Sequence, residues 1–284
     1  MPDELCVMTW EAAVLGSPIS HSLSPVLHRA AYTSLGLDIE YTAIETPTEM
    51  LAQRISQLSE NSLGYSLTMP LKREVLALID NQSQLVTQTG CANTVYRNVE
   101  QDWALENTDV FGIVQTILQA GLAPIKSASI LGSGATASSA LSALAELEVD
   151  TVTCYARNEA AFALLLAQSD VLGIDFHPVT FANDVVLAGD IVISTVPSSA
   201  QRQIISNLAA DQNYPALLDI AYNPWPSDLA SHWASHRAQF HSGPVLSGIE
   251  MLLWQACAQV ELFTGEKAPV EAMRAALPKE LSTA

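Results

Sequence analysis

The chain contains 284 residues, of which 49% are hydrophobic and only 15% are charged. This balance is typical of a globular chain with a large core and argues against disorder, and the length suggests about two domains. With 12 Lys and Arg against 30 Asp and Glu, the net charge is −18, which argues against nucleic acid or an anionic membrane surface as a partner.

The amino terminus carries two acidic residues, Asp3 and Glu4, where a secretory signal would carry basic ones. The longest apolar stretch, residues 251–260, is broken by a glutamine and is shorter than the roughly 18 residues of a membrane helix. The cysteines form no CxxC pair and the histidines no HExxH motif. We therefore expect a cytoplasmic protein with reduced thiols and no metal site. The cysteines are Cys6, Cys91, Cys154 and Cys257.

Short β-rich segments alternate with helical patterns along the first part of the chain. Such alternation predicts an α/β fold in which helices cover parallel strands. Two short segments, 94–96 and 103–105, are expected to form a pair of neighbouring strands. The other predicted elements of this part are strands 12–15, 39–44 and 65–68 and helices 24–35 and 50–58.

The alternation becomes more regular from residue 128 onward. We place a domain boundary in the helix that begins near Asp109, which gives a first domain of residues 1–108 and a second of residues 109–245. The predicted elements beyond the boundary are strands 128–131, 151–155, 191–194 and 217–220 and helices 135–147, 159–167 and 248–277.

Two hydroxyl residues, Ser22 and Ser24, lie in the predicted loop between the first strand and the first helix. Pro25 is well placed as the first helical residue, so Ser24 is a natural helix N-cap. Two hydroxyls on one loop are also suited to bind a carboxylate or a polyol of a ligand. The loop by itself leaves both roles of Ser24 open, helix capping and ligand binding.

Lys72 follows the predicted strand 65–68 and a proline turn, in a chain with few lysines. Ligands of open α/β sheets bind at the carboxyl ends of the strands, so Lys72 is a candidate site residue, and a plain surface lysine is the alternative. Asp109 begins an apolar helix, where a carboxylate stabilises the helix end. The order and spacing of these segments together favour a site over separate structural roles.

A glycine turn, Gly132-Ser133-Gly134-Ala135-Thr136-Ala137, follows the strand 128–131 and precedes a helix. Glycines allow a tight turn and let a diphosphate approach the N–H groups at the helix start. In this context the GxGxxA pattern predicts a dinucleotide site, with an ordinary strand–turn–helix connection as the alternative.

The end of the next strand indicates which dinucleotide the site prefers. It reads Ala156-Arg157-Asn158 and lies about 20 residues beyond the glycine turn. An acidic residue there would bind the ribose hydroxyls of NAD, whereas Arg157 suits the 2′-phosphate of NADP. A solvated surface arginine is the alternative.

Nine segments of the chain resemble, in order, the motifs of the shikimate dehydrogenase family: HSLSP, LTMPLK, CANT, ENTD, GSGATA, YARN, STVP, DIAYNP and GIEMLLWQ. The resemblance spans residues 12–277 and implies an α/β substrate domain followed by a Rossmann-type NADP domain, with residues 246–284 returning to the first domain. It implies the reversible reduction of 3-dehydroshikimate to shikimate by NADPH, in aromatic amino-acid biosynthesis. The expected partner is a small molecule, and the expected state is a monomer or a homodimer.

The resemblance also implies roles for individual residues. Lys72 matches the catalytic lysine of the family and Asp109 the acid beside it, and which of the two gives the proton stays open. The implied substrate-binding residues are Ser22, Ser24, Thr68, Asn93, Tyr222 and Gln255. The implied cofactor-binding residues are Gly132, Ser133, Gly134, Ala135, Thr136, Ala156, Arg157, Asn158, Thr195, Val196, Gly248 and Met251.

The chain departs from the family pattern at several positions. Ser66 stands where asparagine is usual, Ala135 where a second glycine is common, and Val110 where glycine is common. Beyond Arg157, two alanines stand where a second basic residue is usual. A single arginine therefore carries the expected preference for NADP over NAD.

Two other functions fit the same motifs. One is a related enzyme that acts on quinate, or on both substrates, with NAD, and Arg157 argues against it. The other is a ligand- or nucleotide-sensing protein without catalysis, because fold does not imply function. The presence of both Lys72 and Asp109 argues against a sensor, which needs no proton-transfer pair.

Overall fold

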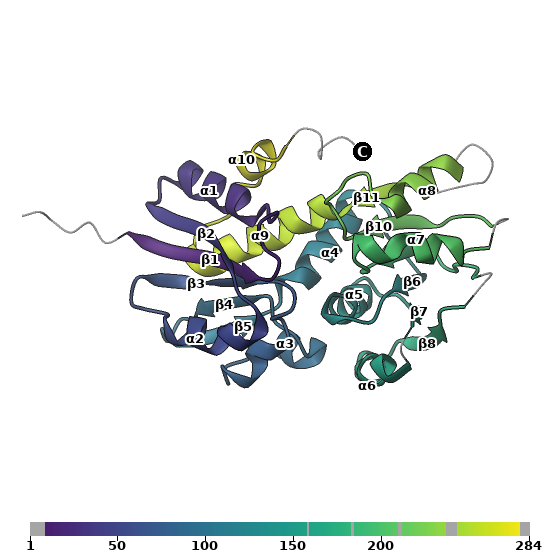
Figure 1. Ribbon diagram of the computed structural model, residues 1–284, viewed down its shortest axis with the longest axis horizontal. Helices are drawn as coiled ribbons and strands as arrows, with labels where there is room; N and C mark the ends of the chain where they lie inside the picture. The colour runs from purple at the N-terminus through teal and green to yellow at the C-terminus, as the bar shows by residue number, and fades with distance from the viewer. Residues whose placement is uncertain (1–8, 158, 183–184, 210–211, 237–242, 279–284) are drawn as a thin grey trace, which may run out of the picture. The chain divides into compact units, whose positions relative to one another are not determined.

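The computed structural model describes residues 9–157, 159–182, 185–209, 212–236 and 243–278. The contacts divide the chain into two compact units (Figure 1). The first unit comprises Met1–Thr87, Cys91–Thr108 and Ala256–Leu277, and the second comprises Gln88–Gly90, Asp109–Gln255 and Pro278–Ala284. The domain limits expected from the sequence, with breaks after residues 108 and 245, stay a prediction.

The first unit contains a mixed five-stranded sheet in the order β2-β1-β3-β4-β5. Strand β1 pairs in parallel with β2 and β3, whereas β4 is antiparallel to both β3 and β5. The expected short pair is therefore confirmed, and its short connection makes it antiparallel. The carboxyl ends of β1, β3 and β5 and the amino end of β4 consequently lie at one edge. The strands are β1 (Trp10–Gly16), β2 (Ile39–Glu45), β3 (Ser62–Leu67), β4 (Thr94–Arg97) and β5 (Trp103–Glu106).

Helices cover both faces of this sheet (Figure 1). Helices α1 (Ser24–Leu35) and α10 (Val270–Ala275) pack together on one face. On the other face, α2 (Leu51–Ser56), α3 (Gln84–Thr89) and the short 3₁₀ turn Glu74–Ala77 close an aliphatic core. A second 3₁₀ turn, Thr48–Met50, directly precedes α2. The expected return of the last helices to the first unit is confirmed for Ala256–Leu277, which belongs to it. The expected bounds of this return, residues 246–284, stay a prediction.

The start of α1 differs from expectation. Its N-cap position is Leu23, no side chain caps the helix, and Ser24 is already its first residue. Of the two roles that the sequence left open for Ser24, that of helix N-cap is therefore wrong. The reason is that Leu23 already has near-helical backbone angles, φ −90° and ψ −1°, so the helix begins earlier than Pro25 suggests.

The second unit contains a six-stranded sheet in the order β11-β10-β9-β6-β7-β8, and all its strand pairs are parallel. The chain starts in the middle, moves to one edge, and then returns to build the other half. This is the order of a dinucleotide-binding sheet, with its ligand crevice between β6 and β9, so the expected Rossmann-type unit is confirmed. The strands are β6 (Ser127–Leu131), β7 (Thr151–Ala156), β8 (Asp175–Thr180), β9 (Ile191–Ser194), β10 (Ala216–Asp219) and β11 (Val245–Ser247).

Helices α5 and α6 cover one face of the parallel sheet and α7 and α8 the other (Figure 1). The sequence patterns missed α3, α7, α8, β8 and β11. The expected helix 248–277 is two helices, because Gly265 adopts φ +72° and Pro269 follows. The helices here are α4 (Thr108–Gln119), α5 (Ala135–Glu146), the 3₁₀ turn Glu159–Ala161, α6 (Phe162–Leu172), α7 (Ser198–Ser206), α8 (Asp228–His236) and α9 (Gly248–Thr264).

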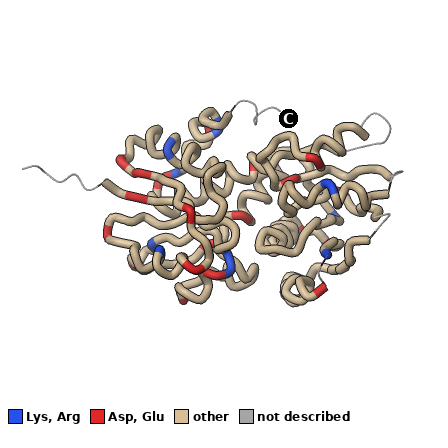
Figure 2. The backbone as a smooth tube through the Cα atoms, in the orientation of Figure 1, with Lys and Arg blue, Asp and Glu red and all other residues tan. Residues whose placement is uncertain are grey.

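Acidic positions are scattered over both units, and the fewer basic positions lie among them (Figure 2). The net charge of −18 is thus spread along the chain and not concentrated in one element. Within the described part of the chain, every helix is too short or too polar to cross a membrane.

The described cysteines, Cys91, Cys154 and Cys257, are buried free thiols, and Cys6 lies outside the described residues. Burial raises the pKa of the Cys154 and Cys257 thiols to about 12. Both side chains therefore remain protonated at neutral pH and act as small apolar groups.

Candidate functional site

The predicted catalytic lysine and several predicted substrate-binding residues of the first unit lie in segments at the same edge of its sheet. Ser22 is in the loop after β1, Thr68 and Lys72 follow β3, and Asn93 directly precedes β4. Lys72 is half-buried, whereas the side chain of Asn93 is only 2% exposed. A half-buried cation and a buried amide therefore belong to one region of the unit.

Backbone hydrogen bonds tie these segments together. The Ser17 N–H donates to the Met69 carbonyl at 2.9 Å, which joins the loops after β1 and β3. The Ala92 N–H donates to the Lys72 carbonyl at 2.8 Å, and the Leu67 N–H donates to the Asn93 carbonyl at 2.7 Å. The segments that carry Thr68, Lys72 and Asn93 are thus held by the backbone itself.

The loop after β1 places its two serines differently. Ser22 is half-buried, whereas Ser24 is 5% exposed inside the first turn of α1. The Ser24 N–H donates to the Ser22 Oγ at 3.3 Å. The Ser22 hydroxyl therefore helps to hold the start of the helix, which is compatible with a second role toward a ligand.

Asn93 is fixed from several sides. Its Oδ1 accepts from the Thr108 N–H and from the Thr94 hydroxyl, each at 2.8 Å. Its Nδ2 donates to the Thr108 hydroxyl at 2.9 Å. The amide can therefore be oriented before any ligand arrives, which is what a binding group needs.

A buried polar network behind Asn93 was missed by the sequence patterns. It joins His28 and Tyr41 to Ser66 on β3 and to Gln259 on α9, and all four side chains are at most 3% exposed. His28 stacks on Tyr41 with ring centroids 4.0 Å apart, and burial lowers the pKa of His28 to about 3. Two signals were available: Ser66 departs from the usual asparagine, and Gln259 lies one helical turn after Gln255.

The remaining predicted catalytic and substrate-binding residues belong to the second unit. Asp109 is 3% exposed in the first turn of α4, and Gln255 is 7% exposed on α9. The Gln255 Nε2 donates to the Leu252 carbonyl at 2.9 Å. Their joint action with Lys72 stays a prediction.

Tyr222 lies in the turn after β10, which a buried carboxylate organises. Asp219 is 0% exposed and accepts hydrogen bonds from Gln201, Ser227 and the Ala221 N–H. Burial raises the pKa of Asp219 even though these hydrogen bonds lower it. Asp219 thus holds both ends of the turn that presents Tyr222.

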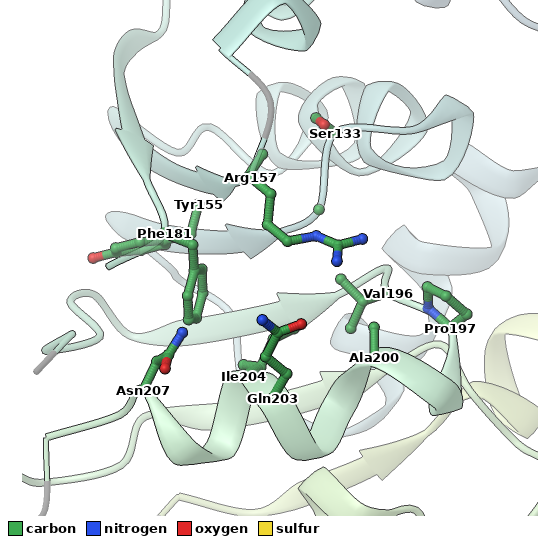
Figure 3. Close-up of a pocket in the computed structure, with 12 residues that line it drawn as sticks. Ser133, Tyr155, Arg157, Phe181, Val196, Pro197, Ala200, Gln203, Ile204 and Asn207 are labelled. Atoms are coloured by element: carbon green, nitrogen blue, oxygen red, sulfur yellow. The ribbon is translucent and has the colours of Figure 1, made fainter. Parts of the chain in front are cut away.

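A cavity of about 310 Å³ opens at the carboxyl ends of β6, β7 and β9 in the second unit (Figure 3). The predicted cofactor residues that line it are Gly132, Ser133, Ala156, Arg157 and Val196. Seven further lining residues were not predicted: Tyr155, Phe181, Pro197, Ala200, Gln203, Ile204 and Asn207. Most of the latter lie on or beside α7 and β8, the elements that the sequence patterns missed.

The glycine turn has the geometry that its pattern predicts. Gly132 has φ +107°, and a Cβ there would lie 2.5 Å from the Thr195 hydroxyl oxygen. A Cβ on Gly134 would meet nothing within 4 Å, and Gly134, directly before α5, is exposed. The helix start is thus accessible to an anion such as a diphosphate.

Arg157 extends across the cavity, with its guanidinium pointing toward Val196 and Pro197, above the side chain of Gln203 (Figure 3). Arg157 is exposed and bears the positive charge that a 2′-phosphate requires. Together with the turn before α5, these residues fit a phosphorylated dinucleotide such as NADP.

Six other predicted cofactor residues do not line this cavity: Gly134, Ala135, Thr136, Thr195, Gly248 and Met251. Asn158, also predicted, lies outside the described residues. Packing accounts for Gly248, because a Cβ there would lie 2.0 Å from the Ile220 carbonyl oxygen. The Met251 carbonyl oxygen lies 2.7 Å from the position of a Cβ on Gly112. A role of either residue beside a nicotinamide stays a prediction.

Comparisons with known proteins identify relatives over nearly the whole chain. Residues 14–95 match the shikimate dehydrogenase substrate binding domain model, and residues 248–277 match the shikimate 5′-dehydrogenase C-terminal domain model. The crystal structure of Mycobacterium tuberculosis shikimate dehydrogenase is 40% identical, covers 94% of this chain and 98% of its own, and superimposes with a TM-score of 0.83.

Two further relatives extend the comparison. Shikimate dehydrogenase (NADP(+)) of Prochlorococcus marinus (strain AS9601) is 28% identical over 95% of this chain and 97% of its own length. The Thermus thermophilus shikimate 5-dehydrogenase, solved in complex with NADP(H) and shikimate, is 28% identical with a TM-score of 0.73, covering 94% and 100% of the two chains.

Proposed function

The chain belongs to the shikimate dehydrogenase family, and we propose that it catalyses the reversible reduction of 3-dehydroshikimate to shikimate with NADPH. The observation that carries the proposal is Arg157 in the cavity beside the glycine turn, in a chain 40% identical to a solved shikimate dehydrogenase. An NAD-binding site would have a carboxylate at that strand end.

We assign the binding of substrate to the polar residues that the family motifs carry. Ser22 and Ser24 bind the carboxylate, Thr68 contacts the substrate, and Asn93 holds a ring hydroxyl. The backbone bonds among the segments after β1 and β3 and before β4 support this grouping. Tyr222 and Gln255, on the turn after β10 and on α9, complete the binding set.

The reaction needs a group that stabilises the negative charge developing on the ketone oxygen. Bound NADPH supplies the hydride for the carbonyl carbon. Lys72 Nζ, as ammonium, stabilises the negative charge that develops on the oxygen, and Asp109 holds the reacting hydroxyl. The oxygen takes up one proton, from Lys72 or from Asp109, and in the reverse direction the same group accepts it.

Binding of the cofactor rests on the second unit. The turn Gly132–Gly134 and the start of α5 would hold the diphosphate, and Arg157 the 2′-phosphate. The apolar residues Phe181, Ile204 and Ala200, which line the same cavity, suit the flat face of an adenine ring.

A steady-state matrix tests the proposal: shikimate and quinate, each with NADP⁺ and NAD⁺, followed by absorbance of the reduced nicotinamide. We expect turnover with shikimate and NADP⁺ to exceed the other three pairs by at least about tenfold. Preference for quinate or for NAD⁺ would overturn the substrate or the cofactor assignment separately. Absence of turnover with every pair would favour a sensing protein.

We further propose a cytoplasmic location and a monomeric or homodimeric state. Buried free thiols suit a reducing compartment. Light scattering during size-exclusion chromatography measures the mass directly, against 30.4 kDa for one chain.

A further inference from the structure

Gln259 lies at the centre of the buried network in the first unit and is 1% exposed. Its Nε2 donates to the Thr94 hydroxyl at 2.9 Å and to the Asn93 carbonyl at 3.2 Å. Its Oε1 accepts from the Ser66 hydroxyl at 2.8 Å and lies 3.3 Å from the His28 Nε2. One side chain of α9 thus contacts α1, β3 and β4.

The direction of each hydrogen bond around Gln259 is determined. A backbone carbonyl can only accept, so the Nε2 and not the Oε1 must face Asn93. The Ser66 hydroxyl accepts from the Tyr41 hydroxyl at 2.7 Å, so its own proton points to Gln259. His28 stays neutral because burial lowers its pKa to about 3, and its Nε2 then serves as the donor to Oε1.

The same logic extends to Asn93. The Thr94 hydroxyl accepts from Gln259 and therefore directs its proton at the Asn93 Oδ1, 2.8 Å away. The Thr108 N–H donates to the same oxygen at 2.8 Å. These two donors fix Oδ1 as the inward atom of the amide and Nδ2 as its donor side.

We infer that Gln259 is a positioning residue of the substrate site, which sets the orientation of the Asn93 amide through the Thr94 hydroxyl. The inference rests on the proposed function, in which Asn93 holds a ring hydroxyl of the substrate. A buried amide that is oriented in advance binds without reorganisation, whereas a free amide would have to be ordered by the ligand.

Ser66 makes room for this arrangement. Its short side chain places a hydroxyl 2.8 Å from the Gln259 Oε1. An asparagine at position 66, the residue usual in the family, would extend into the volume that the Gln259 amide occupies. The departure at Ser66 and the glutamine at 259 therefore belong to one solution for holding Asn93.

The first test replaces Gln259 with Leu, which keeps the approximate volume and removes both the donor Nε2 and the acceptor Oε1. We expect the KM for shikimate to rise about fivefold to tenfold, the effect of one lost hydrogen bond. The KM for NADP⁺ should stay within about twofold, because the cofactor cavity belongs to the other unit. A purely structural role would instead lower the active fraction, and so kcat, without moving the KM for shikimate.

Gln212 offers a matched control in the second unit. It is 6% exposed, accepts from the Leu187 N–H at 2.9 Å and donates to the Val185 carbonyl at 3.1 Å. The substitution Gln212→Leu removes a comparable set of buried bonds. We expect it to lower the Tm while the KM for shikimate stays unchanged.

A second pair of variants tests the same inference if Gln259→Leu does not fold. Thr94→Val removes only the hydroxyl that links Gln259 to Asn93, whereas Thr94→Ser keeps it. We expect Thr94→Val to raise the KM for shikimate about fivefold and Thr94→Ser to remain within about twofold of the unaltered protein. Equal behaviour of the two variants would overturn the assignment.

A double-mutant cycle closes the argument. In the Asn93→Ala background, Gln259→Leu should change the KM for shikimate by less than about twofold, because its effect acts through the missing amide. Full additivity of the two changes would overturn the inference. If the unaltered protein does not turn over shikimate, the proposed function fails and this assignment with it. Turnover by the unaltered protein with an unmoved KM in Gln259→Leu would overturn the assignment alone.

Discussion

The two binding regions of this protein are built by different means. In the first unit, buried side chains from segments far apart in the chain fix one another, as Gln259 and Asn93 do. In the second unit, a backbone turn at Gly132 and one exposed side chain, Arg157, line the cavity and carry the contacts that we propose for the cofactor phosphates. A local sequence pattern therefore predicts the glycine turn and Arg157 of the second region, whereas the buried contacts that fix Asn93 in the first region appear only in the folded chain.

The difference has an energetic consequence. Removing one partner of a buried hydrogen bond leaves the other unpaired, which costs roughly 1–3 kcal/mol of stability besides any functional effect. Removing an exposed arginine costs little stability and mainly affects the ligand that it binds. Changes in the first unit should thus couple activity to stability, and changes in the cofactor cavity should separate them.

The largest expected effect is that of Lys72→Ala, which removes the cation proposed at the ketone oxygen. We expect kcat to fall about 10²–10⁴-fold, the range for a positioned acid or base. The KM for NADP⁺ and the Tm should change little, because Lys72 is half-buried in a loop and belongs to the unit without the cofactor cavity. Steady-state kinetics and a thermal melt measure both.

Two companions sharpen this prediction. Arg73→Ala removes the neighbouring cation and should leave kcat within a few-fold of the unaltered protein. The pH–rate profiles of Asp109→Asn and Lys72→Ala show which of the two residues gives the proton. Only the variant that lacks the proton donor should lose the limb of the profile that this donor produces. Near-normal turnover in Lys72→Ala would refute the assignment.

The next effect concerns the cofactor. Arg157→Ala should raise the KM for NADP⁺ about 10–100-fold, since hydrogen bonds to charged groups contribute about 1.5–3 kcal/mol. The KM for NAD⁺, which lacks the 2′-phosphate, should change less than about threefold, and the Tm should stay the same. An equal rise of the KM for both dinucleotides would mean that Arg157 contacts a part of the cofactor other than the 2′-phosphate. It would also contradict the contrast drawn between the two regions.

A third prediction addresses the backbone turn. Gly132→Ala should lower the free energy of unfolding by roughly 1–3 kcal/mol, because Gly132 has φ +107° and a Cβ would lie 2.5 Å from the Thr195 hydroxyl oxygen. Gly134→Ala is the matched variant, since a Cβ there meets nothing within 4 Å. Equal stability of the two variants in urea titrations would contradict the strain at Gly132.

The sequence predicted the elements of both sheets that carry clear patterns, and it predicted the glycine turn and Arg157. It missed β8, whose Pro178 and polar residues hide the strand, and hence Phe181 at its end. It missed α7, which contributes one wall of the cavity. Edge strands and short surface helices bury little, so their hydrophobic patterns are weak.

The candidate site in the first unit was predicted only in part, for a related reason. Lys72 and Asn93 stand in recognisable motifs, but nothing local pairs Gln259 with Asn93, 166 positions earlier. A buried histidine such as His28 gives no signal until its partners are known. Ser24 shows the converse, because a local rule for helix caps was overridden by the backbone angles of Leu23.

The smallest effect is the pH dependence of the network that holds Gln259. The pKa of His28 is lowered from 6.5 to about 3 by burial, so below pH 6.5 the unfolded chain binds a proton that the folded chain excludes. The free energy of unfolding should therefore fall with decreasing pH from about 6.5 toward 3, by at most about 1.4 kcal/mol per pH unit from this group.

The variant His28→Gln is less stable than the unaltered protein at pH 7, but it lacks this titration. The difference in free energy of unfolding between the two proteins should therefore shrink as the pH falls from 7 to 5. Gln212→Leu, which changes no titratable group, should keep a constant disadvantage over the same range. Urea unfolding curves at pH 7, 6 and 5 compare the three proteins, and parallel slopes for His28→Gln and the unaltered chain would mean that His28 accepts a proton within the folded first unit.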